Sequence, residues 1–503
     1  MHDHRATPRP RPHRIAAAGL ASLATLLFAG ACAVGPDYVR PDMPVPQRFA
    51  GAAGAATEAM PAADAEFWHR FNDPVLDRLV DDALRANHDL RIALARYDRA
   101  NALLRGAGFD RFPTVTAQAT GSDARASAGQ VPGATRAERD TRSSEAGIVA
   151  SWELDLFGRV RRGVEASRAG AGASAADLAA MQVAIVGEVA DSYLELRGLQ
   201  ERLRVAAANA ANQRETLRLV DARFAAGRGT EFDTSRASAQ LETTEARLPA
   251  LDAAIATTMH RLAVLTGRTP DALDAMLETP TGLPTVPVQP AAGTPGDVLR
   301  RRPDVIAAEQ RMHAATARIG VATADLFPRF TLGGLIGSQA LEGSDLFERD
   351  SETHLLALGI DWSFLDIGRV RAHIAAADAD AAGELARYEQ SVLLALEDTE
   401  DALVRNHHAQ AEDAHLQRAA ADSARAAELA RIRFDAGAAD LFEVLDAERT
   451  RLQAQDAFAA ARTRTAISAV ALYRALADGW PGKLPGERSL PARIASTTQG
   501  GHP

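Results

Sequence analysis

Two spacings of hydrophobic residues alternate along the chain. Leucine, isoleucine and valine recur at steps of three and four over 74–112, 159–226 and 232–266, which predicts amphipathic helices. We expect a break at Asn87 and a kink at Pro249. At a rise of about 1.5 Å per residue, a helix over 159–226 would be about 100 Å long, which predicts a coiled coil or a helical tube.

Between the helices, the hydrophobic spacing changes to two. Apolar residues alternate with polar residues along 114–120 and 146–156, which predicts two strands that are apolar on one face and polar on the other. The same alternation returns along 330–336 and 356–364. We expect Gly158 to end the second strand.

The two halves of the chain repeat each other. An offset of 215 positions relates Pro113 to Pro328, and an offset of 210 relates the residues after the strands, so the second half has a shorter loop between its strands. The residues that match at the second offset are Trp152, Gly158, Arg159, Arg223, Phe224, Gly227 and Phe232, which return as Trp362, Gly368, Arg369, Arg433, Phe434, Gly437 and Phe442. Each half therefore consists of a helix, two strands, a long helix and a further helix.

The N-terminus carries a secretion signal. Arginines within 5–14 precede an apolar run over 15–29 that is too short for a dependable membrane span. Small residues directly before Cys32, the only cysteine, resemble a bacterial lipoprotein box, in which this cysteine is lipidated and becomes the first mature residue. The alternative is a plain signal peptide with a buried cysteine. Ala33, where an Asp would resemble an inner-membrane retention signal, favours the outer membrane.

The membrane topology follows from the length of the apolar runs. No run of about 18 apolar residues follows Cys32, so we expect no transmembrane helix in the mature chain. Four amphipathic strands cannot close a barrel by themselves. Either several chains pool their strands in the outer membrane, or the strands form a small sheet packed on helices in a soluble protein. The secretion signal favours the first alternative, and the long helices then project away from the membrane, because each follows a strand directly through Gly158 or Gly368.

These features predict a mainly α fold with a small transmembrane β part and two internal repeats. The chain divides into six segments. They are a lipoprotein signal peptide at 1–31, a lipidated extended segment at 32–73, a first repeat at 74–267 with its strand pair at 113–157, an irregular linker at 268–294, a second repeat at 295–478 with its strand pair at 328–367, and a C-terminal tail at 479–503.

Composition and charge narrow the function. A formal net charge of −10 argues against a nucleic-acid partner. The single cysteine excludes a disulfide framework and a cysteine-based zinc site. The sequence contains no phosphate loop, dinucleotide fingerprint or catalytic serine motif, so we expect no enzyme activity and no cofactor. His407, His408 and His415 lack the spacing of a metal motif, and we expect a surface cluster and no metal site.

Three motifs together resemble one family. Residues 32–38, Cys-Ala-Val-Gly-Pro-Asp-Tyr, look like its mature N-terminus, and residues 301–304, Arg-Arg-Pro-Asp, look like its central signature. Residues 440–448 are similar to its second hairpin tip. On these residues the chain is identified as a member of the outer-membrane efflux lipoproteins of resistance-nodulation-division systems, the TolC-like family, over about 36–480.

The resemblance implies a homotrimer in the outer membrane. Three chains would each give four strands to a twelve-stranded β-barrel, which continues as a long α-helical barrel through the periplasm. The implied partners are a periplasmic adaptor (membrane fusion) protein, an inner-membrane resistance-nodulation-division pump and outer-membrane lipid.

The resemblance also assigns a role to the two helical hairpin tips, at 223–232 and 433–442. Glycines there let the chain reverse with positive φ, and turn chemistry alone is the alternative to a binding role. The tip residues that would contact the adaptor are Arg223, Phe224, Gly227, Arg433, Phe434 and Gly437.

A periplasmic constriction is implied just after the second tip. Phe442 and Asp446 match the family's apolar and acidic constriction residues, and Glu443 stands at a neighbouring acidic position where some relatives have Asp. Glu443 and Asp446 are three apart and share a helix face, so a trimer would turn each into a ring of three carboxylates that favours cations. The alternative is a solvated surface pair.

The implied function is a passive outer-membrane exit duct. It would export small toxic compounds that an inner-membrane pump delivers through the adaptor. Two alternatives stay open at this point: a duct for a type I protein secretion system, and a lipid-anchored periplasmic coiled-coil scaffold without a pore.

The lipoprotein box generates a first prediction. Cys32→Ser should abolish fatty-acid labelling, because the thiol is the acylation point. Metabolic labelling with a radioactive fatty acid measures this, and labelling at the wild-type level would disprove lipidation at Cys32. We expect the trimer still to assemble, because the strands attach the protein to the membrane independently of the lipid.

Overall fold

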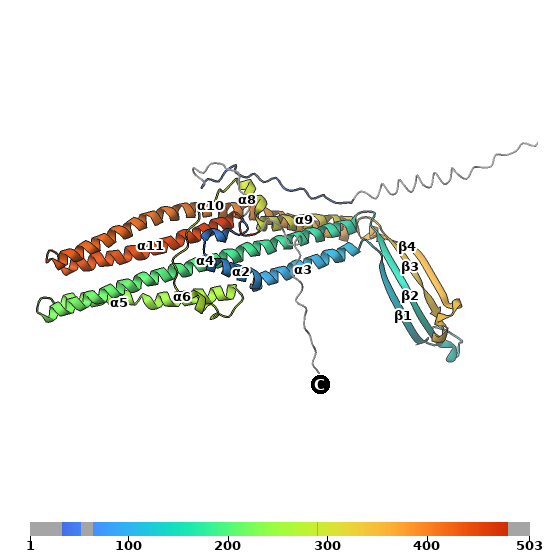
Figure 1. Cartoon of the computed structure of the whole chain (residues 1–503). Helices are drawn as coiled ribbons and strands as arrows, with labels where there is room; N and C mark the ends of the chain where they lie inside the picture. Colours follow the sequence, from blue (N-terminus) through green and yellow to red (C-terminus); the bar gives the residue numbers. More distant parts are fainter. Residues whose placement is uncertain (1–32, 52–63, 289, 481–503) are drawn as a thin grey trace, which may run out of the picture. The chain divides into compact units, whose positions relative to one another are not determined.

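The computed structural model describes residues 33–51, 64–288 and 290–480, whose helices and strands are drawn in Figure 1. The described residues form two compact units. The first unit consists of the described part of Met1–Pro41, with Asp98–Ala173 and Ala308–Tyr388. The second consists of the described parts of Asp42–Tyr97, Ser174–Ala307 and Glu389–Pro503. Each unit takes residues from both sequence repeats, so the repeats and the compact units divide the chain differently.

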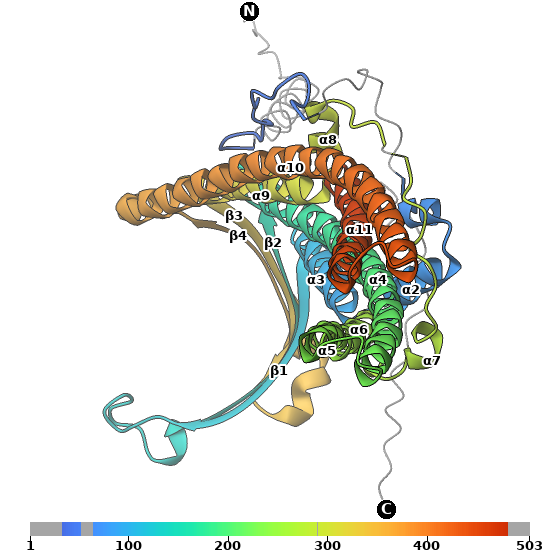
Figure 2. The ribbon, with the colours of Figure 1, turned by 90° about the vertical axis from the view of Figure 1, so that its left-hand side faces the viewer.

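A four-stranded antiparallel sheet is the main feature of the first unit. Its order is β1-β2-β3-β4, and the strands curve along their length (Figure 2). The strands are β1 (Thr114–Arg125), β2 (Asp140–Leu154), β3 (Arg329–Ala340) and β4 (Glu352–Asp361). Within one chain, β1 and β4 are therefore the two edges of the sheet.

The strand register puts the predicted apolar residues on one face. Ile148 lies opposite Ile336, and Ala150 lies opposite both Val115 and Gly334. Residues that lie directly opposite each other point to the same side of a sheet. The large apolar side chains that are exposed on this face are Val115, Ile148, Ile336, Leu356, Leu358 and Ile360. The predicted strand faces are confirmed, and the apolar face is open along all four strands.

Two strand ends differ from the hydrophobic pattern. β1 and β2 continue past the apolar alternation to Arg125 and Asp140, which form an ion pair across the strands. β4 stops at Asp361, so Trp362 and Phe364, expected on its apolar face, follow the strand. Backbone hydrogen bonds between the strands determine where the strands end. Because these bonds need no apolar side chain, the spacing of hydrophobic residues does not predict the strand ends.

The turn between β2 and α4 (Arg159–Ala225) contains Gly158. The expectation that Gly158 ends the strand is wrong, because β2 already ends at Leu154. The φ of Gly158 is +85°, a left-handed conformation that glycine adopts without strain. Asp155 caps α4, because its carboxylate accepts hydrogen bonds from the backbone N–H groups of Val160 and Arg161 at 3.0 and 2.8 Å.

The helices of the first repeat follow the predicted order. They are α2 (Pro74–Ala86), α3 (His88–Phe109), α4, α5 (Glu231–Glu245) and α6 (Leu248–Leu265). The break at Asn87 is confirmed, and its side-chain oxygen accepts hydrogen bonds from the N–H groups of Asp89 and Leu90 at the start of α3. Near the kink expected at Pro249, α5 and α6 are separated by Ala246 and Arg247, which keep helical dihedral angles, and the proline lies in the first turn of α6.

The second repeat has the same order with one difference. Its helices are α8 (Pro295–Arg301), α9 (Pro303–Ala324), α10 (Ile367–Asp435) and α11 (Leu441–Ala475). The helix α11 is continuous, whereas α5 and α6 share the corresponding place in the first repeat. Two short helices, α7 (Asp274–Leu277) and the 3-10 helix η1 (Phe67–Phe71), lie in segments expected to be irregular or extended.

A hydrophobic core holds the second unit together. The rings of Phe67 and Tyr473 stack with their centroids 4.9 Å apart, which explains why η1 is ordered against α11. Tyr193 of α4 donates a hydrogen bond to Asp73 Oδ2 at 2.7 Å, directly before α2. Other fully buried members of this core are Phe71, Leu76, Leu79, Leu194, Leu196, Leu262, Leu265 and Leu273.

Among the described residues, one helix is apolar enough by length and composition to cross a membrane, a test that a mostly buried core helix also passes. In α4, an 18-residue stretch has a mean hydropathy of 1.4. Half of that stretch is buried inside the protein. The helix supplies Ile185, Val186 and Val189 to the core of the second unit, so its apolar character serves packing there.

A partly buried carboxylate, the 28% exposed side chain of Asp191, joins α4 to α11. Asp191 Oδ2 lies 3.3 Å from Arg474 Nη1, and Asp191 Oδ1 has no hydrogen-bond partner among the described residues. Burial raises the pKa of Asp191 to about 6, although the nearby Arg474 acts in the opposite direction.

This carboxylate should make stability depend on pH. The pKa of Asp191 is about 6 in the folded chain and 3.8 at its ordinary value, so the unfolded chain loses the proton first. The free energy of unfolding therefore falls as the pH rises from about 4 to about 6. Asp191→Asn should raise the midpoint of thermal unfolding by roughly 2–4 °C at about pH 8 and leave it unchanged at about pH 4.

The matched control is Asp401→Asn, at the corresponding position of the second repeat, where the side chain is 49% exposed. It should not raise the midpoint at either pH. An effect of Asp191→Asn that is the same at both pH values would contradict the assignment.

Candidate functional sites

The two helical hairpin tips have the same local structure. Each long helix is followed by a glycine in the left-handed region, Gly227 with φ +71° and Gly437 with φ +73°, which confirms the expected positive φ. In the first tip, the Arg228 N–H group donates to the Arg223 carbonyl at 2.8 Å and the Gly227 N–H group to the Phe224 carbonyl at 2.9 Å. The second tip repeats both hydrogen bonds at the same distances.

Side chains cap the helices that return from the tips. At the start of α5, Thr230 accepts a hydrogen bond from the Asp233 N–H group, and Asp233 accepts one from the Thr230 N–H group. At the start of α11, Asp440 accepts a hydrogen bond from the Glu443 N–H group at 2.9 Å. Local bonds therefore hold both turns, and in the second turn the Arg433 guanidinium also donates a hydrogen bond to the Ala438 carbonyl at 3.3 Å.

Arginine–aromatic contacts join the two tips of one chain. The guanidinium carbon of Arg223 lies 4.6 Å from the centroid of the Phe434 ring, and that of Arg236 lies 4.1 Å from the centroid of the Phe442 ring. Sequence analysis missed Arg236, because the spacing within one helix does not show which residue of another helix faces it. Phe224 is 47% exposed and Phe442 is 54% exposed, so both rings keep an open surface.

The two expected constriction carboxylates each have an arginine partner in the same chain. Glu443 Oε2 lies 3.1 Å from Arg433 Nη1, and Asp446 Oδ1 lies 2.6 Å from Arg449 Nη2. Both carboxylate side chains are 44% exposed. A neighbouring cation weakens the field of a carboxylate at a distance, so these residues would make a less negative ring than the acidic residues alone suggest.

The histidines that were expected to form a surface cluster make ordinary contacts. The rings of His407 and His408 lie with their centroids 5.4 Å apart, and His415 Nδ1 is 3.1 Å from Arg418 Nη2. Within the described residues, no three His, Cys, Asp or Glu side chains are placed to hold a metal ion.

The segment after the expected lipidation residue is docked on the first unit. Cys32 itself lies outside the described residues, and we call residues 33–40 the N-terminal arm. The Val34 N–H group donates to the Phe157 carbonyl at 3.1 Å. Gly35 has φ +86°, and a Cβ atom on it would lie 2.5 Å from Gly320 Cα in α9, so this position requires glycine.

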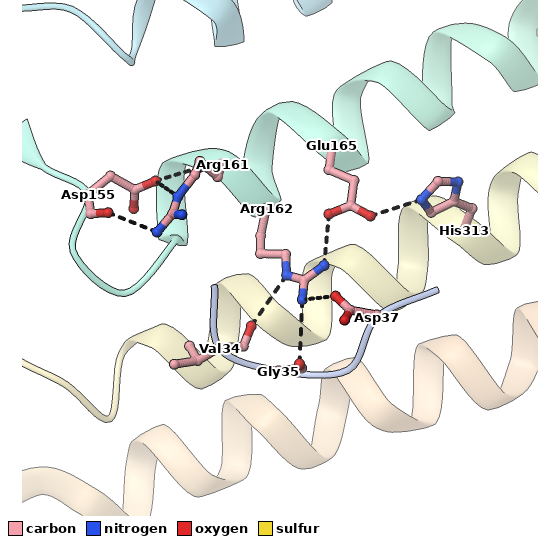
Figure 3. Close-up of polar contacts among 8 residues, drawn as sticks. All are labelled: Val34, Gly35, Asp37, Asp155, Arg161, Arg162, Glu165 and His313. Atoms are coloured by element: carbon pink, nitrogen blue, oxygen red, sulfur yellow. Dashed lines mark hydrogen bonds and ion pairs between the residues drawn. The ribbon is translucent and has the colours of Figure 1, made fainter. Parts of the chain in front are cut away.

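Arg162 of α4 holds the arm through both backbone and side chain (Figure 3). Its guanidinium donates to the carbonyls of Val34 and Gly35 at 3.3 and 3.5 Å. It also donates to Asp37 Oδ1 at 2.6 Å and to Glu165 Oε2 at 2.9 Å. Arg162 is only 5% exposed, and these acceptors compensate its buried charge.

The contacts continue from Arg162 along the arm. Glu165 Oε1 is hydrogen-bonded to His313 Nε2 at 2.9 Å (Figure 3). The His313 ring stacks on the Tyr38 ring with centroids 4.3 Å apart. The Tyr38 hydroxyl donates to Glu309 Oε1 at 3.1 Å. Burial opposes the ionisation of Glu165, but the hydrogen bonds from His313 and Arg162 hold its pKa below its usual value.

Sequence analysis did not find this docking site. It predicted an extended segment at 32–73, and the resemblance drew attention to residues 32–38 without naming a partner. Arg162 and Glu165 are three apart on α4, a spacing that is common on solvated helix surfaces. Only the fold shows that these two side chains meet the arm.

Comparisons with known proteins agree with one another. A family model described as outer membrane efflux protein matches residues 79–268 and 294–478, which are nearly the two repeats. The chain is 33% identical over 463 residues to outer membrane protein OprJ of Pseudomonas aeruginosa, covering 92% of this chain and 96% of OprJ. It is 33% identical over 433 residues to the pyoverdine export outer membrane protein OpmQ of Pseudomonas putida, covering 86% of this chain and 91% of OpmQ. The solved structure of the outer-membrane channel OprN has a TM-score of 0.83 and 40% sequence identity, and the match covers 89% of this chain and 100% of that chain.

The role of Arg162 can be tested by hydrogen–deuterium exchange. Arg162→Met keeps an apolar stem and removes every donor, so the arm should detach. Exchange of a peptide that contains residues 33–40 should become at least about tenfold faster, because the charge-assisted hydrogen bonds that are lost contribute more than about 1.4 kcal/mol.

Arg168→Met is the matched control, because Arg168 is an exposed arginine on the same helix. It should leave the exchange of the arm unchanged. Full protection in Arg162→Met would mean that packing at Gly35 and Tyr38 holds the arm without the guanidinium.

Proposed function

The chain belongs to the outer membrane efflux protein family, and from this premise we propose that it is the outer-membrane exit duct of a tripartite efflux pump. An inner-membrane resistance-nodulation-division pump and a periplasmic adaptor would deliver small toxic compounds, which the duct would export passively. The observation that carries the proposal is the sheet with its open apolar face, whose strands β2 and β4 lead directly into the long helices α4 and α10.

Assembly as a homotrimer would pair the two open edges of the sheet. Lipid offers no hydrogen bonds to unpaired backbone groups, so neither β1 nor β4 can stay an edge there. If β4 of each copy pairs with β1 of the next, three copies give a closed twelve-stranded barrel with its apolar face outward. The long helices would then continue as an α-helical barrel in the periplasm.

Lipid at Cys32 would add a second attachment to the outer membrane, the location that the family indicates. The proposal includes a signal peptide at 1–31 and a lipidated segment at 32–73, which precede the two repeats, the linker between them and the C-terminal tail. No step of passive export requires catalysis, because the pump supplies the energy.

The helical tips are the proposed contact with the adaptor. The candidate residues are Arg223, Phe224, Gly227, Arg433, Phe434 and Gly437. Arg223 already contacts Phe434, and Arg433 already pairs with Glu443. The first contact joins the two tips and the second lies within one tip. An adaptor that binds Arg223 or Phe434 would therefore compete with the contact between the tips, which would couple its binding to their separation.

The proposed periplasmic constriction consists of Phe442, Glu443 and Asp446. In a trimer, three copies of each side chain would surround the axis, and the carboxylates would favour cations. The partners Arg433 and Arg449 would moderate this preference. A solvated pair on the outside of the tube is the competing arrangement.

The two alternative functions have less support. The family match spans both repeats and is to efflux proteins, which favours efflux over type I protein secretion. A periplasmic scaffold without a pore would leave the open apolar face of the sheet in water, where its exposed side chains would promote aggregation.

Planar-bilayer recordings test the duct and its constriction. The purified protein should conduct ions and favour cations. Asp446→Ala should weaken cation selectivity and block by multivalent cations, because it removes negative charge from the axis. Phe442→Ala should raise the conductance with little change in selectivity, because it widens the opening.

Arg449→Ala is the control of opposite sign, because it removes the partner that masks Asp446. It should strengthen cation selectivity. Unchanged selectivity in both Asp446→Ala and Arg449→Ala would place this carboxylate outside the tube, and a folded wild-type protein without any conductance would overturn the duct.

A further inference from the structure

The polar face of the sheet in the first unit carries one row of large apolar side chains. Val149 of β2 lies opposite Leu335 of β3, and Leu335 lies opposite Leu355 of β4. Residues that lie directly opposite each other point to the same side of a sheet, so these side chains stand next to one another, on the face away from Ile148 and Ile336. We call Val149, Leu335 and Leu355 the apolar row.

The rest of this face is polar or small. Among the strand residues of the described sheet, the other positions on this face are threonine, serine, glutamine, glycine, alanine and charged residues. Glu145 and Glu153 each lie four positions from Val149 along β2. Glu145 accepts a hydrogen bond from Gln339 at 2.8 Å, and Glu153 accepts one from Arg159 Nε at 2.8 Å. The exceptions to the alternation therefore lie side by side, and polar residues bound them at both ends.

Small residues flank the row and leave it uncovered. The next row toward one end of the strands contains Gly147 and Gly337, and a Cβ atom on Gly337 would lie 2.7 Å from Gly147 Cα, so the backbones leave no room for a side chain there. The next row toward the other end contains Gly333 and Ala357. Leu355 is accordingly 60% exposed. An exposed apolar patch with a polar rim is typical of a surface that binds another apolar group.

The proposed twelve-stranded barrel puts this face in the lumen. Strands about 4.8 Å apart with a tilt of about 40° give a circumference of about 75 Å and a diameter of about 24 Å between opposite backbones. Side chains extend about 5 Å from each wall, half of the distance between packed sheets, which leaves an opening of about 14 Å. Apolar rows on opposite walls are therefore too far apart to pack on each other, whereas a small organic solute passes close to the wall.

We propose that the apolar row is a contact site for the apolar part of the solutes that the duct exports. The row covers three neighbouring strands, a width of about 10 Å, which matches an aromatic ring or a short alkyl chain. Thr116 of β1 lies opposite Val149 and interrupts the apolar surface, so a trimer presents three separate patches. The inference rests on the proposed function, because it places the polar face of the sheet in the lumen.

Protection from a thiol reagent detects a solute at the row. The full protein with Leu355→Cys is solubilised in detergent, and a charged maleimide labels the new thiol from the water-filled lumen. The wild-type protein gives the background. Tetrabutylammonium should slow this labelling at least about threefold more than tetramethylammonium, which has the same charge and less apolar surface, because burying one methylene group changes an affinity about fourfold.

Two other positions are matched controls for the labelling. Leu356→Cys, on the apolar face, should react more slowly than Leu355→Cys, because detergent covers that face. Thr114→Cys, on the polar face at the start of β1, should react without protection by either cation. Faster reaction of Leu356→Cys would place the row in lipid and overturn the proposal.

Planar-bilayer recordings test the row without a new thiol. Valine and threonine are both β-branched and both suit strands. The double variant Val149→Thr with Leu355→Thr therefore differs from Leu355→Val only by a hydroxyl in place of a methyl group at two positions of each row. The double variant should weaken the block of the current by tetrabutylammonium at least about threefold relative to Leu355→Val, with the block by tetramethylammonium unchanged.

The outcomes separate the row from the duct. Equal protection of Leu355→Cys by the two cations would overturn the row, and so would equal block in the double variant and Leu355→Val; a conducting wild-type protein would then retain the duct. Protection by tetrabutylammonium in a folded protein that never conducts would retain the row as a site for apolar groups and overturn the duct.

Discussion

The two unpaired edges of the four-stranded sheet are the constraint on which the proposed assembly depends. Backbone N–H and C=O groups without partners are expensive in lipid, so a sheet that enters a membrane must close. The internal repeat already pairs two strand edges within one chain. Each repeat contributes one hairpin, and the pairing of β2 with β3 joins the two hairpins. In the proposed twelve-stranded barrel, a chain with a single repeat would need six copies instead of three.

Because the two repeats are in one chain, residues at matching positions can make different contacts. Arg223 contacts the ring of Phe434, whereas its counterpart Arg433 pairs with Glu443. The side chain of Asp191, 28% exposed, pairs with Arg474 of α11, whereas that of its counterpart Asp401 is 49% exposed. The repeats therefore preserve the order of elements and the turn geometry, while side-chain contacts between them have diverged.

Local signals predicted much of the fold, because they act within a few residues. Asn87 caps a helix, Gly227 and Gly437 adopt positive φ, and strict alternation fixes which face of a strand is apolar. Contacts between distant elements could not be predicted in this way. Arg162, Arg236 and Arg449 look like ordinary surface arginines in the sequence, and only the packing of helices shows what each of them meets. The compact units escaped prediction for the same reason, since long-range contacts define them.

If Cys32 carries the proposed lipid, the docked arm leaves almost no slack between lipid and protein. Only Ala33 separates Cys32 from the first backbone hydrogen bond, at Val34, and two extended residues reach at most about 7 Å. A flexible linker would absorb a change in bilayer thickness around the protein by uncoiling. Two residues are too short to absorb a change in bilayer thickness, so that change would pull directly on Arg162 and the first turns of α4.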